Sequence, residues 1–215
     1  MSARVPYDEI ADWYEHEFLV AQRTAGPGSD DGFADRLGID QALVELLGRG
    51  SGACLEIGCG TGIYADRIRR LGWAPLGVDV SAGMLRHARA RLPVTVGDAT
   101  RLPFRTESID AAIAVMVHTD MPDYPAVLDE IHRVLRPGGV FVSIGVHPCF
   151  CGGFADRTSP DAIIIRHGYL DGRWTKESWT TGGVRDKVGA VHFPLPQLLN
   201  AFVESGFELA EFSEG

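Results

Sequence analysis

The chain has 215 residues, of which 45% are hydrophobic and 23% are charged, and its formal net charge is −9. This length suits one domain with a full core, and the composition is typical of a globular protein. The acidic balance argues against a nucleic-acid backbone as the main partner, because such binding depends on lysine and arginine.

The first predicted element is an amphipathic helix over residues 6–20, with Tyr7, Ile10 and Phe18 on one stripe. A polar connector follows over 24–35, and a second helix over 36–47 ends at a glycine-rich stretch. We interpret residues 1–48 as an N-terminal helical cap.

A short apolar run over 53–57 then leads into a turn with glycine at three alternate positions, Gly58, Gly60 and Gly62. A helical pattern begins at Ile63. Strand, glycine turn and helix together place backbone N–H groups and a helix N-terminus against a ligand. A β-carbon in this turn would obstruct either the required backbone angles or the close approach of that ligand.

Two acids follow this turn at equal spacing. Asp79 ends the next apolar run, nineteen positions after Gly60, and Asp98 ends a third run nineteen positions further on. An acid at the tip of the second strand can accept hydrogen bonds from both hydroxyls of a ribose. A dinucleotide fingerprint would need glycine at position 63, which is isoleucine, so a nicotinamide-dependent oxidoreductase is disfavoured.

The rest of the chain continues the alternation of strands and helices. We expect a helix over 82–91 capped by Ser81, a strand over 109–117, a helix over 124–135, a strand over 140–146, a helix over 194–205 and a sixth strand over 207–212. This pattern predicts an α/β fold, a Rossmann-like, doubly wound, mostly parallel sheet with helices on both faces.

An insertion follows the fifth strand. It covers residues 147–192, is rich in glycine and aromatic residues, and contains a hairpin turn predicted at 170–173. An insertion of this length and composition is typical of a substrate lid.

The motifs resemble those of the class I S-adenosylmethionine-dependent methyltransferases, in the small-molecule group of the ubiquinone- and menaquinone-biosynthesis type. The matching segments lie within residues 50–147 and are 55–62, 77–81, 97–99, 102–104, 108–110 and 135–139. The family's sheet has a seventh, antiparallel strand, and this chain ends before one. The resemblance implies S-adenosyl-L-methionine as the cofactor and S-adenosyl-L-homocysteine as the product.

The resemblance also implies roles for individual residues. Residues expected to contact the cofactor are Tyr14, Glu56, Gly58, Gly60, Asp79, Val80, Met84, Asp98, Ala99 and Val115. Residues expected to contact the acceptor are Tyr7, His118, His147, Phe150, Trp179 and His192. If the reaction needs a base, His192 is the first candidate, because similar enzymes often carry a histidine just before the last helix, and His118 is the second.

The predicted organisation is a single methyltransferase domain: cap 1–48, cofactor-binding core 49–147, lid-like insertion 148–192, and final helix and strand 193–215. The predicted reaction is in-line methyl transfer to an oxygen or nitrogen, and less readily a carbon, of a small-molecule acceptor. A cofactor-binding protein without catalysis is the alternative. The sequence lacks the Asp/Asn-Pro-Pro-aromatic signature of nucleic-acid methylation, so no nucleic-acid partner is expected.

We expect a cytoplasmic monomer or homodimer without a membrane partner, since no targeting segment or long apolar span is visible. The four cysteines, at positions 54, 59, 149 and 151, fit neither a zinc site nor a disulfide framework and are interpreted as reduced thiols. No metal site is expected, and Asp120 and Asp123 are interpreted as solvated surface acids.

Overall fold

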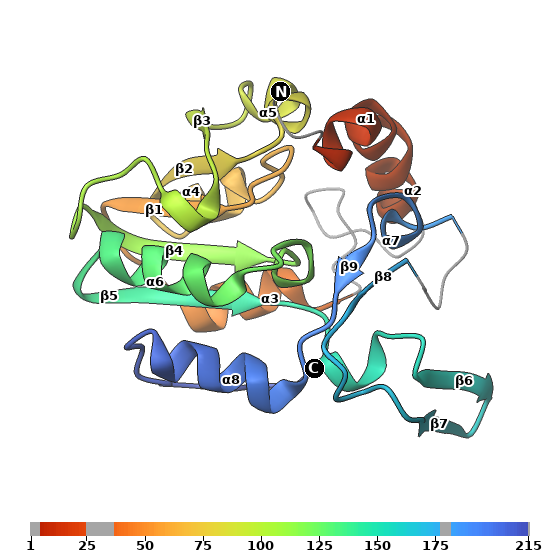
Figure 1. The fold of residues 1–215 in the computed structure, drawn as a ribbon. Coiled ribbons are helices and arrows are strands. Elements are labelled where there is room, and N and C mark those ends of the chain that lie inside the picture. Colours follow the sequence, from red (N-terminus) through yellow and green to blue (C-terminus); the bar gives the residue numbers. More distant parts are fainter. Residues whose placement is uncertain (1–4, 25–36, 177–181, 215) are drawn as a thin grey trace.

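Five parallel strands form the central sheet, in the order β3-β2-β1-β4-β5 (Figure 1). They are β1 Ala53–Ile57, β2 Ala74–Asp79, β3 Val94–Val96, β4 Ile109–Val115 and β5 Leu135–Ile144. The computed structural model describes residues 5–24, 37–176 and 182–214. The predicted α/β, Rossmann-like sheet is confirmed.

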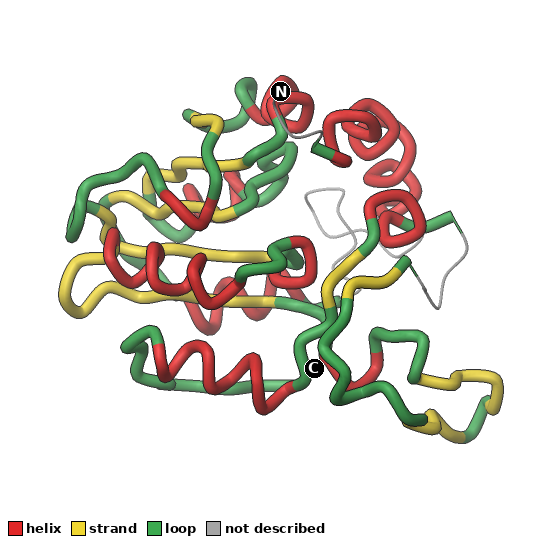
Figure 2. The backbone as a smooth tube through the Cα atoms, in the orientation of Figure 1, coloured by secondary structure: helices red, strands yellow, loops and turns green. Residues whose placement is uncertain are grey.

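Helices cover both faces of this sheet (Figure 2). One face packs against α6 Tyr124–Val134 and α8 Leu195–Glu204. The other packs against α3 Ile39–Ala42, its π-helical continuation η2 Leu43–Leu47, and α4 Ala65–Arg70. Alternate residues of β4 supply the two cores: Ala112 and Ala114 face α6, whereas Ala111 and Ile113 face the opposite layer.

The strand order reverses between β1 and β4, because the chain builds β1, β2 and β3 outward and then returns to add β4 and β5 on the other side. In open α/β sheets, ligands bind outside the carboxyl ends of the strands at such a switch point. The glycine turn after β1 and the segment after β4 meet at this edge.

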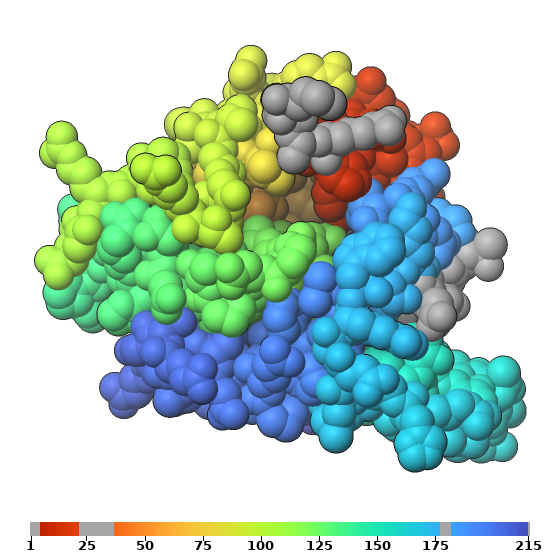
Figure 3. All heavy atoms as spheres, in the orientation of Figure 1, coloured from red at the N-terminus to blue at the C-terminus, as the bar shows by residue number. Residues whose placement is uncertain are grey.

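The N-terminal segment is helical from Pro6 to Thr24, longer than predicted, and consists of α1 Pro6–Trp13, the π-helical turn η1 Tyr14–Phe18 and α2 Leu19–Thr24. Helix α1 packs on α5 Ala82–Ala88 of the core and on α7 Val184–Val188 of the insertion. In Figure 3 the N-terminal helix and the atoms around α7 adjoin on one face of the molecule. The ammonium of Lys187 in α7 lies 4.4 Å from the ring centroid of Trp13.

The insertion folds differently from its prediction. It contains η5 Pro148–Phe150, β6 Ala155–Ser159, β7 Ala162–Ile165, β8 Trp174–Thr175, α7 and β9 Ala190–Val191. The hairpin pairs β6 with β7 and turns at 160–161, so the hairpin turn predicted at 170–173 is wrong. The reason is that the chain after 173 pairs with β9: the N–H of His192 donates to the carbonyl of Arg173 at 3.0 Å.

The sixth strand predicted over 207–212 is also wrong, because the structure has no strand there. The N–H of Phe207 donates to the carbonyl of Phe202, and its ring packs against Phe141 with centroids 5.4 Å apart. Leu209 and Phe212 are exposed. Phe207 therefore closes the end of α8 on the core, and the residues after it do not join the sheet.

Among the other boundaries the start of β5 differs clearly from the prediction, because the strand begins at Leu135 rather than at 140. Helix α4 begins at Ala65 rather than Ile63. Among the described residues, none of the helices combines the length and the apolar character needed to cross a membrane.

Candidate active site

The turn after β1 depends on its glycines. Gly58, Gly60 and Gly62 have φ values of 62°, 51° and 74°, which are left-handed conformations that side chains disfavour. A β-carbon on Gly58 would lie 2.9 Å from Cγ1 of Val117, and one on Gly62 would lie 2.4 Å from Cδ2 of Leu92. At these three positions the turn thus presents backbone that no side chain covers.

Asp79 joins this turn to the end of β2. Its Oδ2 accepts a hydrogen bond from the N–H of Gly60 at 2.8 Å, and its Oδ1 accepts one from the N–H of Ser81 at 2.8 Å. Burial raises the pKa of this carboxyl, although the backbone bonds oppose the rise. Each carboxylate oxygen keeps a second lone pair, so Asp79 can still accept from two hydroxyls of a ligand. Its neighbour Val80 is exposed beside it.

Glu56 lies one residue before the end of β1 and is only 3% exposed. Its Oε2 is buried and has no hydrogen-bond partner among the described residues. Burial, assisted by the charge of Asp79, raises the pKa of this carboxyl to about 8. A buried acid without a partner is costly, and a cationic group of a ligand would relieve that cost.

The adjacent strand ends supply the remaining predicted cofactor residues. Asp98 follows β3 and caps a short 3₁₀ helix, Ala99–Arg101, by accepting from the N–H of Thr100 at 2.9 Å. Met84 is buried in the first turn of α5, with its Cε 3.4 Å from the position of a β-carbon on Gly60. Val115 is buried at the end of β4. These residues follow β3, β2 and β4, on both sides of the glycine turn.

Acids of the N-terminal helix fasten it over this edge. Oδ1 of Asp8 accepts from the hydroxyl of Ser81 at 2.7 Å and from the N–H of Gly83 at 2.8 Å, at the start of α5. Glu15 pairs with Arg91, which also donates to the carbonyl of Thr61 in the glycine turn at 2.7 Å.

The same helix brings two tyrosines to the site. Burial and the charge of Asp120 raise the pKa of Tyr14, with smaller effects from Asp79 and Glu56, so its phenol lies in a field of acids and stays protonated. The hydroxyl of Tyr7 donates to Oδ2 of Asp120 at 3.1 Å. Tyr7 thus reaches the segment after β4 and Tyr14 lies near the acids of the site, and their roles as contacts of the acceptor and the cofactor stay predictions.

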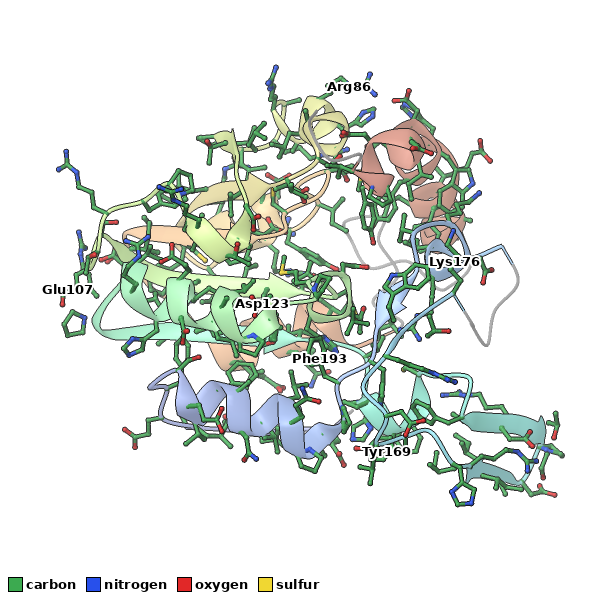
Figure 4. The ribbon with its side chains drawn as sticks, viewed as in Figure 1. Arg86, Glu107, Asp123, Tyr169, Lys176 and Phe193 are labelled. Atoms are coloured by element: carbon green, nitrogen blue, oxygen red, sulfur yellow. The ribbon has the colours of Figure 1, made fainter. Side chains whose placement is uncertain are left out.

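Asp120 belongs to the 3₁₀ helix η4 His118–Asp120, which follows β4. It is partly buried and bonded to Tyr7, so its interpretation as a solvated surface acid is wrong; Asp123 is exposed and caps α6 (Figure 4). Burial raises the pKa of Asp120 to about 7, while Tyr7 and the charge of Arg185 oppose the rise. Met116, just before η4, has a φ of 58°, a strained conformation for a side chain and one that clusters at functional sites.

His118 is 5% exposed, and its ring fills the space beside Gly145, where a β-carbon would lie 2.4 Å from Nδ1. Burial lowers the pKa of this imidazole to about 4, and the charges of Arg185 and His192 add to the effect. It is therefore neutral at pH 7.

His192 lies in the insertion, and the contacts of its ring are with other residues of the insertion rather than with the glycine turn. Its Nε2 lies 2.6 Å from the carbonyl oxygen of Tyr169, and its ring packs on Phe154 with centroids 4.6 Å apart (Tyr169 is labelled in Figure 4). Burial lowers its pKa, and the charge of Arg185 acts in the same direction. It lines a cavity of about 140 Å³ within the insertion.

The other predicted acceptor residues lie elsewhere. Nε2 of His147 is 2.5 Å from Oε1 of Glu214, and its ring lies 4.8 Å from that of Phe150, which is 40% exposed. The pair thus contacts the C-terminal segment and not the Tyr7–Asp120 bond. Trp179 lies outside the described residues.

Asp120, Arg185 and Asp8 had not been predicted as site residues; the signal for Asp120 was its place just after the buried strand β4.

The comparisons with known proteins agree with this geometry. Residues 55–143 match the family model described as a methyltransferase domain. The chain is 40% identical over 98 residues to a demethylmenaquinone methyltransferase of Mycobacterium sp. (strain KMS), which covers 45% of this chain and 43% of that protein. It is 34% identical over 104 residues to a malonyl-[acyl-carrier protein] O-methyltransferase of Yersinia pestis, covering 46% of this chain and 39% of that protein. The chain thus spans less than half the length of these curated relatives.

Among solved structures, an S-adenosylmethionine-dependent methyltransferase from Mesorhizobium loti superposes with a TM-score of 0.66 and 26% identity, covering 82% of each chain. The predicted resemblance to the class I methyltransferases is confirmed. The two curated relatives carry different acceptors in their names, so the family alone leaves the acceptor open.

Proposed function

We propose, from the class I S-adenosylmethionine-dependent methyltransferase domain that this chain contains, that the protein transfers a methyl group to an oxygen or nitrogen atom of a small-molecule acceptor, with carbon as the third choice. The observation that carries this proposal is the buried Oε2 of Glu56 near the end of β1, which has no hydrogen-bond partner among the described residues.

When bound, S-adenosylmethionine supplies a methyl group activated by a positive sulfur, and it also carries an ammonium group, two ribose hydroxyls and an adenine ring. The residues present fit this group. Glu56 offers a buried acid to the ammonium, Asp79 offers two acceptors to the hydroxyls, and Gly60 leaves room for close approach. Asp98 and Ala99 would hold the polar edge of the ring, while Val80 and Met84 would contact its faces.

The chain's contribution to the reaction is mainly positioning, because a methyl on a positive sulfur needs little further activation. Helix α1 packs on α7, and its Tyr7 reaches Asp120 after β4, so we expect these helices to restrict water there. Tyr7 and Asp120 place a donor and an acceptor at this point. These two side chains would orient a lone pair of the acceptor toward the methyl group.

Asp120 is our first choice for the proton that an O–H or N–H acceptor loses. A general base works best when its pKa is near the working pH, and the pKa of Asp120 is about 7. His118, with a pKa of about 4, is a weaker base, and His192 has its Nε2 engaged with Tyr169. Both histidines remain proposed acceptor contacts and alternative bases.

The proposal is tested by calorimetry with S-adenosylhomocysteine and by turnover with methyl-labelled cofactor and candidate acceptors. We expect binding by the wild type and about tenfold or more weaker binding by Glu56→Gln, since the lost contact is a charge-assisted hydrogen bond. The matched control is Glu17→Gln, an exposed acid of η1. Equal affinity of all three proteins would contradict the cofactor site. Binding without turnover of any acceptor would favour the non-catalytic alternative.

We further propose that the protein acts in the cytoplasm, as a monomer or homodimer, without nucleic acid or membrane as partner. The support is the net charge of −9 and four cysteines that are all unpaired.

A further inference from the structure

The cavity within the insertion has a basic lining, although the chain as a whole is acidic. Five of its lining side chains are arginine or histidine, and none of its lining residues in the described structure is an acid. The basic side chains are Arg166, His167, Arg173, Arg185 and His192. Such a concentration of donors around one small space favours an anion.

These cations differ in how far the protein already neutralises them. Arg166 pairs with Asp156, with Nε 3.2 Å from Oδ2. Arg185 donates to the carbonyl of Cys151; burial lowers the pKa of its guanidinium, and the charge of Asp120 opposes that shift. Arg173 contributes its carbonyl to β9 and has no side-chain ion pair among the described residues. Arg173 therefore has positive charge to offer to a ligand, and Arg185 lines the same cavity.

The size of the cavity limits what it can hold. Its volume is about 140 Å³, whereas sites for whole drug-sized molecules measure roughly 300–1,000 Å³. Glycines at 152, 153 and 168 line it and leave backbone accessible. The space therefore suits one polar group of a ligand, such as a carboxylate or a phosphate, with the remainder of that ligand lying outside.

Arg185 connects the cavity to the candidate active site. It lines the cavity, and its charge also acts on Asp120 and His118, which lie at the end of β4. Strand β9 supplies Ala190 and Val191 to the lining. It packs against η4, the helix that contains His118 and Asp120. A ligand anchored in the cavity would extend toward the point where Tyr7 meets Asp120.

We infer that this cavity is the subsite for an anionic group, a carboxylate or a phosphate, of the methyl acceptor, bound by Arg173 and Arg185. This inference rests on the proposed methyl transfer. It makes the acceptor an anionic small molecule whose charged end lies in the insertion and whose nucleophilic atom lies at Asp120.

The test is calorimetric titration of the protein with inorganic phosphate and, separately, with succinate. We expect saturable binding by the wild type and about tenfold or more weaker binding by Arg173→Gln and by Arg185→Gln, since each loses a charge-assisted contact. Arg105→Gln is the matched control, because it removes the same charge from an exposed position in the loop before β4, and it should bind as the wild type does. If phosphate binds more tightly than succinate, the anionic group of the acceptor is a phosphate. If succinate binds more tightly, that group is a carboxylate.

Absence of saturable binding to the wild type, or equal weakening by Arg105→Gln, would overturn the inference. A circular dichroism melt shows whether Arg185→Gln folds. If it does not, Arg185→Lys and Arg173→Gln test the inference instead: the lysine variant keeps the charge and should retain most of the affinity for the anion, whereas Arg173→Gln should lose it. S-adenosylhomocysteine is titrated into the same samples. Cofactor binding without anion binding overturns this inference alone, whereas anion binding without cofactor binding overturns the proposed function.

Discussion

The hydroxyl of Tyr7 donates to Oδ2 of Asp120 at 3.1 Å, across 113 positions of sequence. The bond joins the N-terminal helix to the segment after β4, so the acid at the centre of the candidate site acquires its surroundings only when that helix is in place. It also lowers the pKa of Asp120, which burial raises to about 7.

Tyr7→Phe should therefore raise the pKa of Asp120 further, since the variant loses a donor to the ionised form. If Asp120 is the base, the acidic limb of the kcat/KM profile should move to higher pH, with a loss of about 0.5–1.5 kcal/mol in stability. Carboxyl-carbon NMR of labelled aspartate measures the shift directly. An unchanged titration of Asp120 would contradict the structural assignment.

Asp8 offers a test of how the N-terminal helix is held. Asp8→Ala removes two hydrogen bonds to the start of α5, from Ser81 and Gly83. We expect residues 6–18 to exchange amide hydrogens faster and S-adenosylhomocysteine to dissociate about tenfold faster, since the lost bonds are charge-assisted. Glu17→Ala removes a charge from an exposed position of the same helix and serves as the control. Equal exchange rates in both variants would show that Asp8 does not fasten the helix.

The buried carboxyl group of Glu56 should make the free energy of unfolding of the ligand-free protein depend on pH. Its pKa rises from 4.5 to about 8 on folding, so between these values the folded state holds a proton that the unfolded state has released. Stability should therefore fall as pH rises through this window, by up to about 1.4 kcal/mol per pH unit from this group. Urea unfolding between about pH 6 and 8 measures the slope. Glu56→Gln should flatten it; a parallel slope in the variant would contradict the raised pKa.

The predicted cofactor contacts should also differ in how much each contributes to the free energy of cofactor binding. Asp79→Ala should weaken S-adenosylhomocysteine binding by about 1–3 kcal/mol, because it removes an acceptor for the ribose and frees the N–H groups of Gly60 and Ser81. Asp98→Ala should weaken it less, because Asp98 is exposed. Asp66→Ala, an exposed acid of α4, is the control for charge. Calorimetry that finds all three variants equal to the wild type would refute the assignment.

The local part of the site could be predicted from sequence. The glycine turn follows β1, Asp79 ends β2 and Asp98 comes two residues after β3, so spacing along the chain fixes their place at one edge of the sheet. Asp120 and Asp123 look alike in sequence, yet one is covered by the N-terminal helix and the other caps a helix in solvent. That difference comes from tertiary packing, which no local pattern encodes.

The structures of the insertion and of residues 207–212 could not be predicted from local sequence patterns, for a related reason. Residues 207–212 alternate as a strand does, but Phe207 packs under α8 and the following residues find no neighbouring strand. The turn at 170–173 has hairpin composition, yet its downstream arm pairs with residues 190–192. In both segments the choice of partner, not local propensity, decides the structure.

The final prediction separates the proposed base from the histidine that the sequence ranked first. Asp120→Asn keeps the size of the side chain and its acceptance of the Tyr7 hydrogen bond but cannot take up a proton, so kcat should fall by about 10²-fold or more for a hydroxyl acceptor. His192→Gln changes a cavity wall whose Nε2 is already engaged with Tyr169, so KM for the acceptor should rise while kcat stays near that of the wild type. Steady-state kinetics across pH, with cofactor affinity as the control for folding, compares the two variants. The reverse pattern, a large loss of kcat in His192→Gln with loss of the acidic limb and little change in Asp120→Asn, would return the role of base to His192.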